Sequence, residues 1–177
     1  MNTSTKTTPL LLFPFLIACL AFMPRAHAAE LDILPNGNTA YGGGVLVSLT
    51  SGVWNSGFGF EALNHDTAGH NNTATGLRAL FSDTSGSYNT ATGVYALYGN
   101  TTGWYNNAAG AYALTNNISG SYNTANGYAA LFRNTASNNT ANGFAALYFN
   151  TANGNTATGF ATLYKNSTGH GNTADGI

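Results

Sequence analysis

Charge is what this sequence has least of. Its 177 residues include only five Lys and Arg and six Asp and Glu, so 6% are charged, whereas soluble domains carry roughly 25%. Such scarcity excludes a basic nucleic-acid binder, an acidic tail and a helical bundle laced with salt bridges. Disorder is excluded as well, because 44% hydrophobic and 12% aromatic residues supply apolar surface that disordered segments lack. Asn and Thr dominate the polar residues, so neutral amides and hydroxyls must form most of the polar surface exposed to solvent.

Cysteine is nearly absent, and its one copy lies in an N-terminal export signal. An apolar stretch from Pro9 to Met23 follows Lys6 and precedes the small-x-small sequence Ala26-His27-Ala28, which is typical of a secretory cleavage site. We predict a signal peptide over residues 1–28 and a mature chain with no thiol chemistry and no transmembrane span. The alternative is a lipoprotein tether at Cys19, because Leu-Ile-Ala-Cys resembles a lipoprotein cleavage box. Both predict an exported protein at the cell surface or outer membrane, or outside the cell.

A repeat makes up the rest of the chain. Residues 38–177 are copies of Asn-Thr-Ala-x-Gly-x-x-Ala-Leu with a tail, 16 or 17 residues long, of which eight are complete and a ninth stops after six residues. A period this short is typical of a solenoid, in which each coil buries its apolar face against its neighbours. We therefore predict an all-β fold, a parallel β-roll, with residues 29–37 as an N-terminal segment that caps the first coil.

Each coil is expected to begin with a short strand and a buried amide. Thr73 and Thr75 alternate with Ala74, so the hydroxyls should face outward while the Ala and the preceding Asn face inward. Buried amides must be hydrogen-bonded, and the first Asn of each copy should therefore form a structural ladder from coil to coil. Its central members are Asn72, Asn89, Asn106, Asn123, Asn139 and Asn155.

After the glycine of each copy the apolar spacing changes. Phe144, Leu147 and Tyr148 lie at i, i+3 and i+4, and this spacing predicts a helical face. We expect a short helical or 3₁₀ turn from Phe144 to Phe149 that buries these side chains, with the recurring leucine in the core. The following Asn should occupy the left-handed C-terminal position of the turn, as Asn134, Asn150 and Asn166 do in three copies.

The Ala-x-Gly-x-x-Ala core, as in residues 72–80, resembles the head repeats of trimeric autotransporter adhesins, the YadA-like heads of bacterial surface fibres. The resemblance covers residues 38–177. It implies a parallel β-roll that trimerises and attaches to host, glycan or abiotic surfaces. The copies here are longer than the family's usual repeat, and no heptad stalk or anchor barrel is among the 177 residues. We therefore expect either a longer chain or a partner that caps the last coil.

Aromatic residues supply the candidate ligand-binding face. Tyr88, Tyr105 and Tyr122 recur in one column over three consecutive coils, and Trp104 lies beside it. A flat aromatic strip can stack on sugar rings or on a partner's apolar surface. The alternative is that the stacked rings only stabilise an edge of the solenoid.

The titratable residues predict no catalytic group. Asp66 and Asp83 occupy one column in adjacent coils, where paired carboxylates could share a proton or hold a cation, or could simply replace the turn-forming Asn of other coils. His70 and His170 share a column six coils apart, and His65 lies on another edge. We predict no enzyme, no catalytic residue, no metal, no cofactor and no nucleic-acid partner.

Together these features favour an exported structural or adhesive repeat module at the bacterial cell surface. Self-association as a trimer or end to end is expected, because terminal coils expose strand edges and apolar columns unless they are capped. The alternative is an ice-binding solenoid. Outward-facing Thr pairs, such as Thr73 with Thr75 and Thr90 with Thr92, would stack into a flat face of regularly spaced hydroxyls. Phe58 interrupts this arrangement of hydroxyls.

Overall fold

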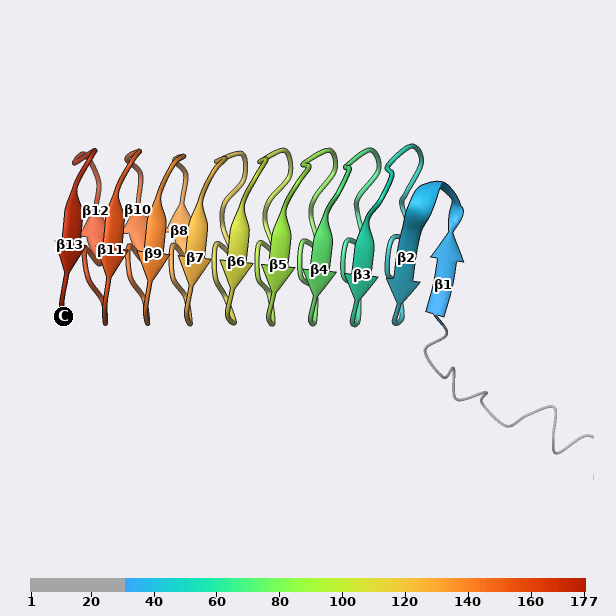
Figure 1. Ribbon diagram of the computed structural model, residues 1–177, viewed down its shortest axis with the longest axis horizontal. Helices are drawn as coiled ribbons and strands as arrows, with labels where there is room; N and C mark the ends of the chain where they lie inside the picture. Colours follow the sequence, from blue (N-terminus) through green and yellow to red (C-terminus); the bar gives the residue numbers. More distant parts are fainter. Residues whose placement is uncertain (1–30) are drawn as a thin grey trace, which may run out of the picture.

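The Thr-Ala-x segment of each copy forms a strand, and these strands stack in parallel into one long sheet (Figure 1). The computed structural model describes residues 31–177. Each coil returns the chain to the same side of the sheet, so the predicted all-β solenoid is confirmed. The parallel strands are β2 (Asn38–Tyr41), β3 (Ser56–Phe58), β4 (Thr73–Thr75), β5 (Thr90–Thr92), β6 (Asn107–Ala109), β7 (Thr124–Asn126), β9 (Thr140–Asn142), β11 (Thr156–Thr158) and β13 (Thr173–Asp175).

An antiparallel strand covers the N-terminal edge of this sheet. Strand β1 (Leu31–Leu34) pairs with β2 in register from Leu31–Tyr41 to Leu34–Asn38, and the 3₁₀ turn η1 (Pro35–Gly37) joins the two strands. The backbone groups of β2 on that side are therefore paired. The predicted signal peptide, with Cys19, lies outside the described residues. Within residues 31–177, no helix is long and apolar enough to cross a membrane.

Side chains alternate across the sheet as predicted. Thr73 pairs with Thr90 and Ala74 with Ala91 in the parallel register of β4 and β5. Both alanines are fully buried and both threonines are exposed. The sheet therefore shows hydroxyls to solvent and methyl groups to the core.

The recurring leucine fills the core, which confirms its predicted burial. The leucines form one hydrophobic cluster with the buried alanines of the strands and with most of the residues directly before them in the chain. Burying a leucine side chain stabilises the fold by about 1.5 to 3 kcal/mol, and the gain recurs in every coil. The fully buried members are Leu63, Leu80, Leu97, Leu114, Leu131 and Leu147.

The helical turn expected from Phe144 to Phe149 is wrong. Ala145 and Leu147 have φ angles of 53° and 50°, and the segment ends in strand β10 (Phe149–Asn150). The Leu147 N–H donates to the Thr162 carbonyl of the next coil at 3.0 Å, whereas a helix would bond it to a residue four positions earlier. The i, i+3, i+4 spacing therefore marks a corner of the coil.

The asparagines expected at the end of that turn are strand residues instead. They close β8 (Arg133–Asn134), β10 (Phe149–Asn150) and β12 (Lys165–Asn166), with their side chains buried. These strands form a second parallel sheet, in the order β12-β10-β8, which lies behind β9, β11 and β13 in Figure 1. The last coils thus carry a second flat face.

A glycine column lets the coils approach each other at one corner. Gly93 has a φ of 135°, and a Cβ there would lie 2.6 Å from the carbonyl oxygen of Gly110 in the next coil. Only glycine tolerates both that backbone conformation and that contact. The column consists of Gly42, Gly59, Gly76, Gly93, Gly110, Gly127, Gly143, Gly159 and Gly176.

Candidate functional site

A ladder of buried asparagines holds the coils in register. The Asn89 N–H donates to Asn72 Oδ1 at 3.0 Å, and Asn89 Oδ1 accepts the Asn106 N–H at 2.9 Å. Its Nδ2 donates to the Gly103 carbonyl at 2.8 Å. These side chains are satisfied and buried, so the ladder positions the outer columns and is not itself a binding surface. The same pattern includes Asn123, Asn139 and Asn155.

A second buried column changes from amides to carboxylates at one end. Asn117 Nδ2 donates to Asn100 Oδ1 at 3.0 Å, and Asn100 Nδ2 donates to Asp83 Oδ1 at 2.9 Å. The next member is Asp66, whose Oδ1 accepts the Gly69 N–H at 2.7 Å. Asp66 Oδ2 is the one buried side-chain oxygen or nitrogen without a hydrogen-bond partner in the described part of the chain.

Burial shifts the protonation of this carboxylate pair. Burial raises the pKa of Asp66 to about 6, although the neighbouring His70 and backbone N–H groups oppose the shift. Burial, followed by the charge of Asp66, raises the pKa of Asp83 to about 8. At neutral pH Asp83 therefore holds a proton beside a largely ionised Asp66. The buried pair therefore carries about one proton at neutral pH.

Of the three histidines among residues 31–177, His70 is the one whose charge acts on Asp66. His70 Nδ1 accepts the Val53 N–H at 3.2 Å, while the His65 ring packs against Phe81 with centroids 4.5 Å apart. His170 is exposed near the C-terminal coil. Among residues 31–177, no group of three or more His, Cys, Asp or Glu side chains could hold a metal ion.

The structure brings the three candidate tyrosines together on the outside of the solenoid. The Tyr88 and Tyr105 rings stack with centroids 4.8 Å apart, and Tyr105 and Tyr122 with centroids 5.1 Å apart. The three side chains, here called the tyrosine column, are 47%, 45% and 59% exposed. Trp104, directly before Tyr105 in the chain, is exposed too. Parallel rings at coil spacing give a rigid aromatic strip open to solvent.

A second exposed column follows the turn glycines and was missed from the sequence. Phe144 was expected inside a helical face, but Phe144 and its counterpart Phe160 are both exposed and stack with centroids 5.0 Å apart. The left-handed corner turns them outward while it turns Leu147 inward. Their position directly after each glycine was the signal available in the sequence. This post-glycine column contains Phe60, Leu77, Val94, Tyr128, Phe144 and Phe160.

No protein-family model, curated protein or solved structure was found to match the chain. The likeness of its repeats to adhesin heads therefore depends on the repeat residues alone. The exposed columns and the second sheet are the features from which a function can be argued.

Proposed function

We propose that this protein is an exported structural and adhesive repeat module of the bacterial cell surface, and that it acts without catalysis. The solenoid is the scaffold, and the tyrosine column is the surface that attaches to glycans or to apolar material. The single observation that carries this proposal is the exposed stack of Tyr88, Tyr105 and Tyr122. Export rests on the signal-peptide pattern of residues 1–28.

Two properties make the tyrosine column suitable for attachment. The backbone that carries the rings is bonded to adjacent coils, for example through the Tyr105 N–H, which donates to the Ser87 carbonyl at 3.1 Å. The rings also stack on one another, so little conformational freedom is lost on binding. The solenoid also does not need aromatics there, because Asn138, Gly154 and Gly171 occupy the same column in later coils. Trp54 also occupies this column, but Asn71 separates it from Tyr88, so the continuous aromatic strip covers three coils. A strip of this limited length favours contact with a ligand over a general structural role.

The test is the triple substitution of Tyr88, Tyr105 and Tyr122 by Ser. We expect an unchanged circular dichroism spectrum. Attachment to glycan-coated and alkyl-coated sensor surfaces should weaken about a hundredfold or more, because each of the three lost aromatic anchors costs about 1 kcal/mol or more.

A matched control replaces three tyrosines outside this column by Ser. That control should attach as the parent protein does. A tyrosine-column variant that unfolds, or that attaches as well as the parent, would show that the rings are structural. The control consists of Tyr95, Tyr98 and Tyr112, whose rings pack against one another.

We also propose that the protein self-associates, laterally as a trimer or end to end. The support is the post-glycine column, because a continuous apolar strip on a soluble protein marks an interface. Light scattering of the purified protein over a range of concentrations tests this. Replacing Phe144 and Phe160 by Ser should shift the population toward monomer, while a parent protein that stays monomeric at high concentration contradicts the proposal.

Ice binding is the second candidate, favoured by the outer face of the long sheet. Its strands place Thr, Ser or Asn in one unbroken column, and seven of the nine positions are Thr. The neighbouring column is mixed, since it contains Phe58 and Ala109. Thermal hysteresis and ice recrystallisation assays on the purified protein decide between the two. Clear activity in either would favour ice binding over adhesion.

A further inference from the structure

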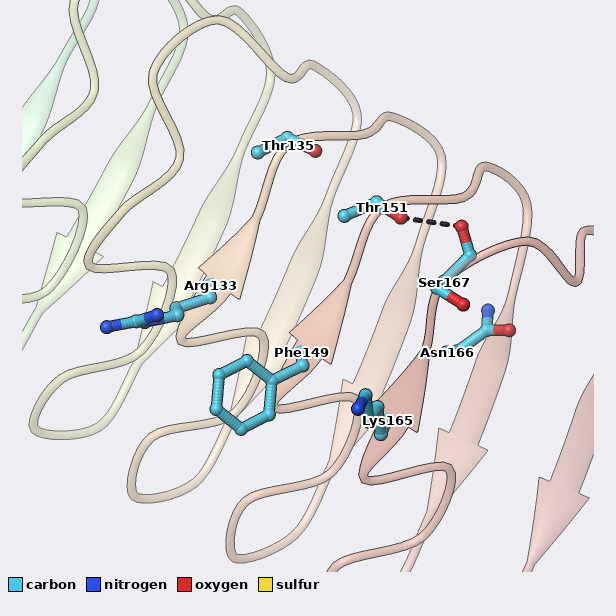
Figure 2. Close-up of a pocket in the computed structure, with 7 residues that line it drawn as sticks. All are labelled: Arg133, Thr135, Phe149, Thr151, Lys165, Asn166 and Ser167. Carbon is cyan, nitrogen blue, oxygen red and sulfur yellow. Dashed lines mark hydrogen bonds between the residues drawn. The ribbon is translucent and has the colours of Figure 1, made fainter.

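The second sheet carries a cluster of cationic and aromatic side chains. Phe149 on β10 pairs in register with Arg133 on β8 and with Lys165 on β12, so the three side chains leave the same face of the sheet. Figure 2 shows Phe149 between the two cations, with a row of hydroxyl side chains further along the strands. This patch borders a depression of about 360 Å³, whose hydroxyl row consists of Thr135, Thr151 and Ser167.

The patch is local to the last coils because of the sequence there. Arg133 and Phe149 belong to the two copies that are 16 residues long, and strands β8, β10 and β12 form only in this part of the solenoid. The earlier coils carry small or weakly basic residues at the equivalent position. Those residues are Ser48, His65, Ser82, Gly99 and Asn116.

Free positive charge is concentrated in this patch. Of the three Lys and Arg residues in the described chain, Arg78 is paired with Glu61, with Nε 2.6 Å from Oε2. Arg133 and Lys165 form no ion pair within residues 31–177, and no acidic side chain lines the depression. The Arg133 guanidinium lies 5.5 Å from the centroid of the Phe149 ring. The patch thus offers two exposed cations on either side of an aromatic ring.

We propose that this patch binds a linear acidic polysaccharide that runs along the solenoid axis. Arg133 and Lys165 would each contact a carboxylate or sulfate group, about 10 Å apart for residues two strands apart. Phe149 would stack on a sugar ring between them, and the Thr and Ser hydroxyls would bond the sugar hydroxyls.

Charge selects this ligand over nucleic acid. Proteins that bind nucleic acid neutralise many phosphates with Lys and Arg, whereas this patch has two cations on a chain of net charge −1. A hydroxyl-rich polymer with widely spaced charges matches one ring, two cations and a hydroxyl row. The inference rests on the proposed attachment function, but it places a ligand class on a different face from the tyrosine column.

The experiment measures binding of the purified protein to polygalacturonate, which is carboxylated, and to dextran sulfate. Neutral dextran and polyglutamate serve as comparison polymers. The parent protein should bind at least one acidic polysaccharide and should bind both comparison polymers more weakly. The stronger of the two acidic ligands identifies the preferred anionic group.

Single substitutions then locate the site. Lys165→Gln and Arg78→Gln each remove one positive charge, but only the first lies in the patch. Lys165→Gln and Arg133→Gln should each weaken binding several-fold, and the double variant about tenfold, as expected for exposed charge pairs. Phe149→Ser should also weaken binding, while Arg78→Gln should leave it unchanged.

Four results would overturn the inference. Two concern the variants: the double variant binds like the parent, or Arg78→Gln weakens binding as much as Lys165→Gln does. Two concern the polymers: polyglutamate binds as tightly as the acidic polysaccharides, or neither acidic polysaccharide binds. The tyrosine-column variant should keep its affinity for the acidic polysaccharide even where it loses attachment elsewhere. Failure of this site and failure of the tyrosine column are therefore separate outcomes.

Discussion

Replacing Asp83 by Asn should stabilise the protein at neutral pH and change little at acid pH. Asp83 is fully buried and lies one coil from Asp66, whose Oδ2 has no partner. In the next coil Asn100 Nδ2 donates to Asp83 Oδ1 at 2.9 Å and to the Gly103 carbonyl at 3.2 Å. An Asn at position 83 can donate to Asp66 in the same way, so the amide column would gain one more rung.

The expected gain follows from the protonation of Asp83. Burial and the charge of Asp66 raise its pKa from 3.8 to about 8. The folded state therefore keeps this proton up to about pH 8, whereas the unfolded chain releases it near pH 4, and stability falls as pH rises between these values. At about 1.4 kcal/mol per pKa unit, the raised pKa of Asp83, which includes repulsion from Asp66, disfavours folding by about 4 kcal/mol at pH 7. The raised pKa of Asp66, about 6, acts in the same direction.

Urea unfolding followed by circular dichroism, at several values across about pH 4 to 8, measures this effect. The parent protein should lose stability as pH rises, and Asp83→Asn should lose much less. Asp175→Asn is the matched control, because Asp175 is an exposed carboxyl on β13, and it should follow the parent. Parallel pH profiles of the parent and Asp83→Asn would refute the reasoning, as would a variant that is less stable than the parent at pH 8.

Two further substitutions test the packing between coils. Asn89→Leu keeps a similar volume but removes the oxygen that accepts the buried Asn106 N–H at 2.9 Å. The unpaired N–H should cost about 1 to 3 kcal/mol of stability. An unchanged melting temperature would show that the asparagine ladder does not stabilise the fold. Gly93→Ala places a Cβ 2.6 Å from the backbone of the next coil at a φ of 135° and should cost about 2 kcal/mol or more. Gly171→Ala, which has open space around it, should cost less, and equal melting temperatures for the two alanine variants would contradict the proposed close approach.

The repeat pattern predicts both the solenoid and its inner and outer faces. In a stack of equivalent coils, each residue has its own counterpart as a neighbour one coil away. Columns such as Tyr88, Tyr105 and Tyr122 can therefore be aligned without a structure. The burial of Leu97 and the outward direction of Thr90 also followed from the residue pattern, because alternation and burial energetics constrain them strongly.

The construction of the corners depends on contacts between coils, which the residue pattern does not contain. The spacing of Phe144, Leu147 and Tyr148 is the same in a helix and in this left-handed corner, so a local pattern does not distinguish them. The Leu147 N–H donates to Thr162 in the next coil, and this long-range bond replaces the helical one. As a result Phe144 faces solvent, and a second sheet forms in the last coils. The three residues of the cationic patch recur every 16 positions in the sequence, but that sheet is what places their side chains on one exposed face.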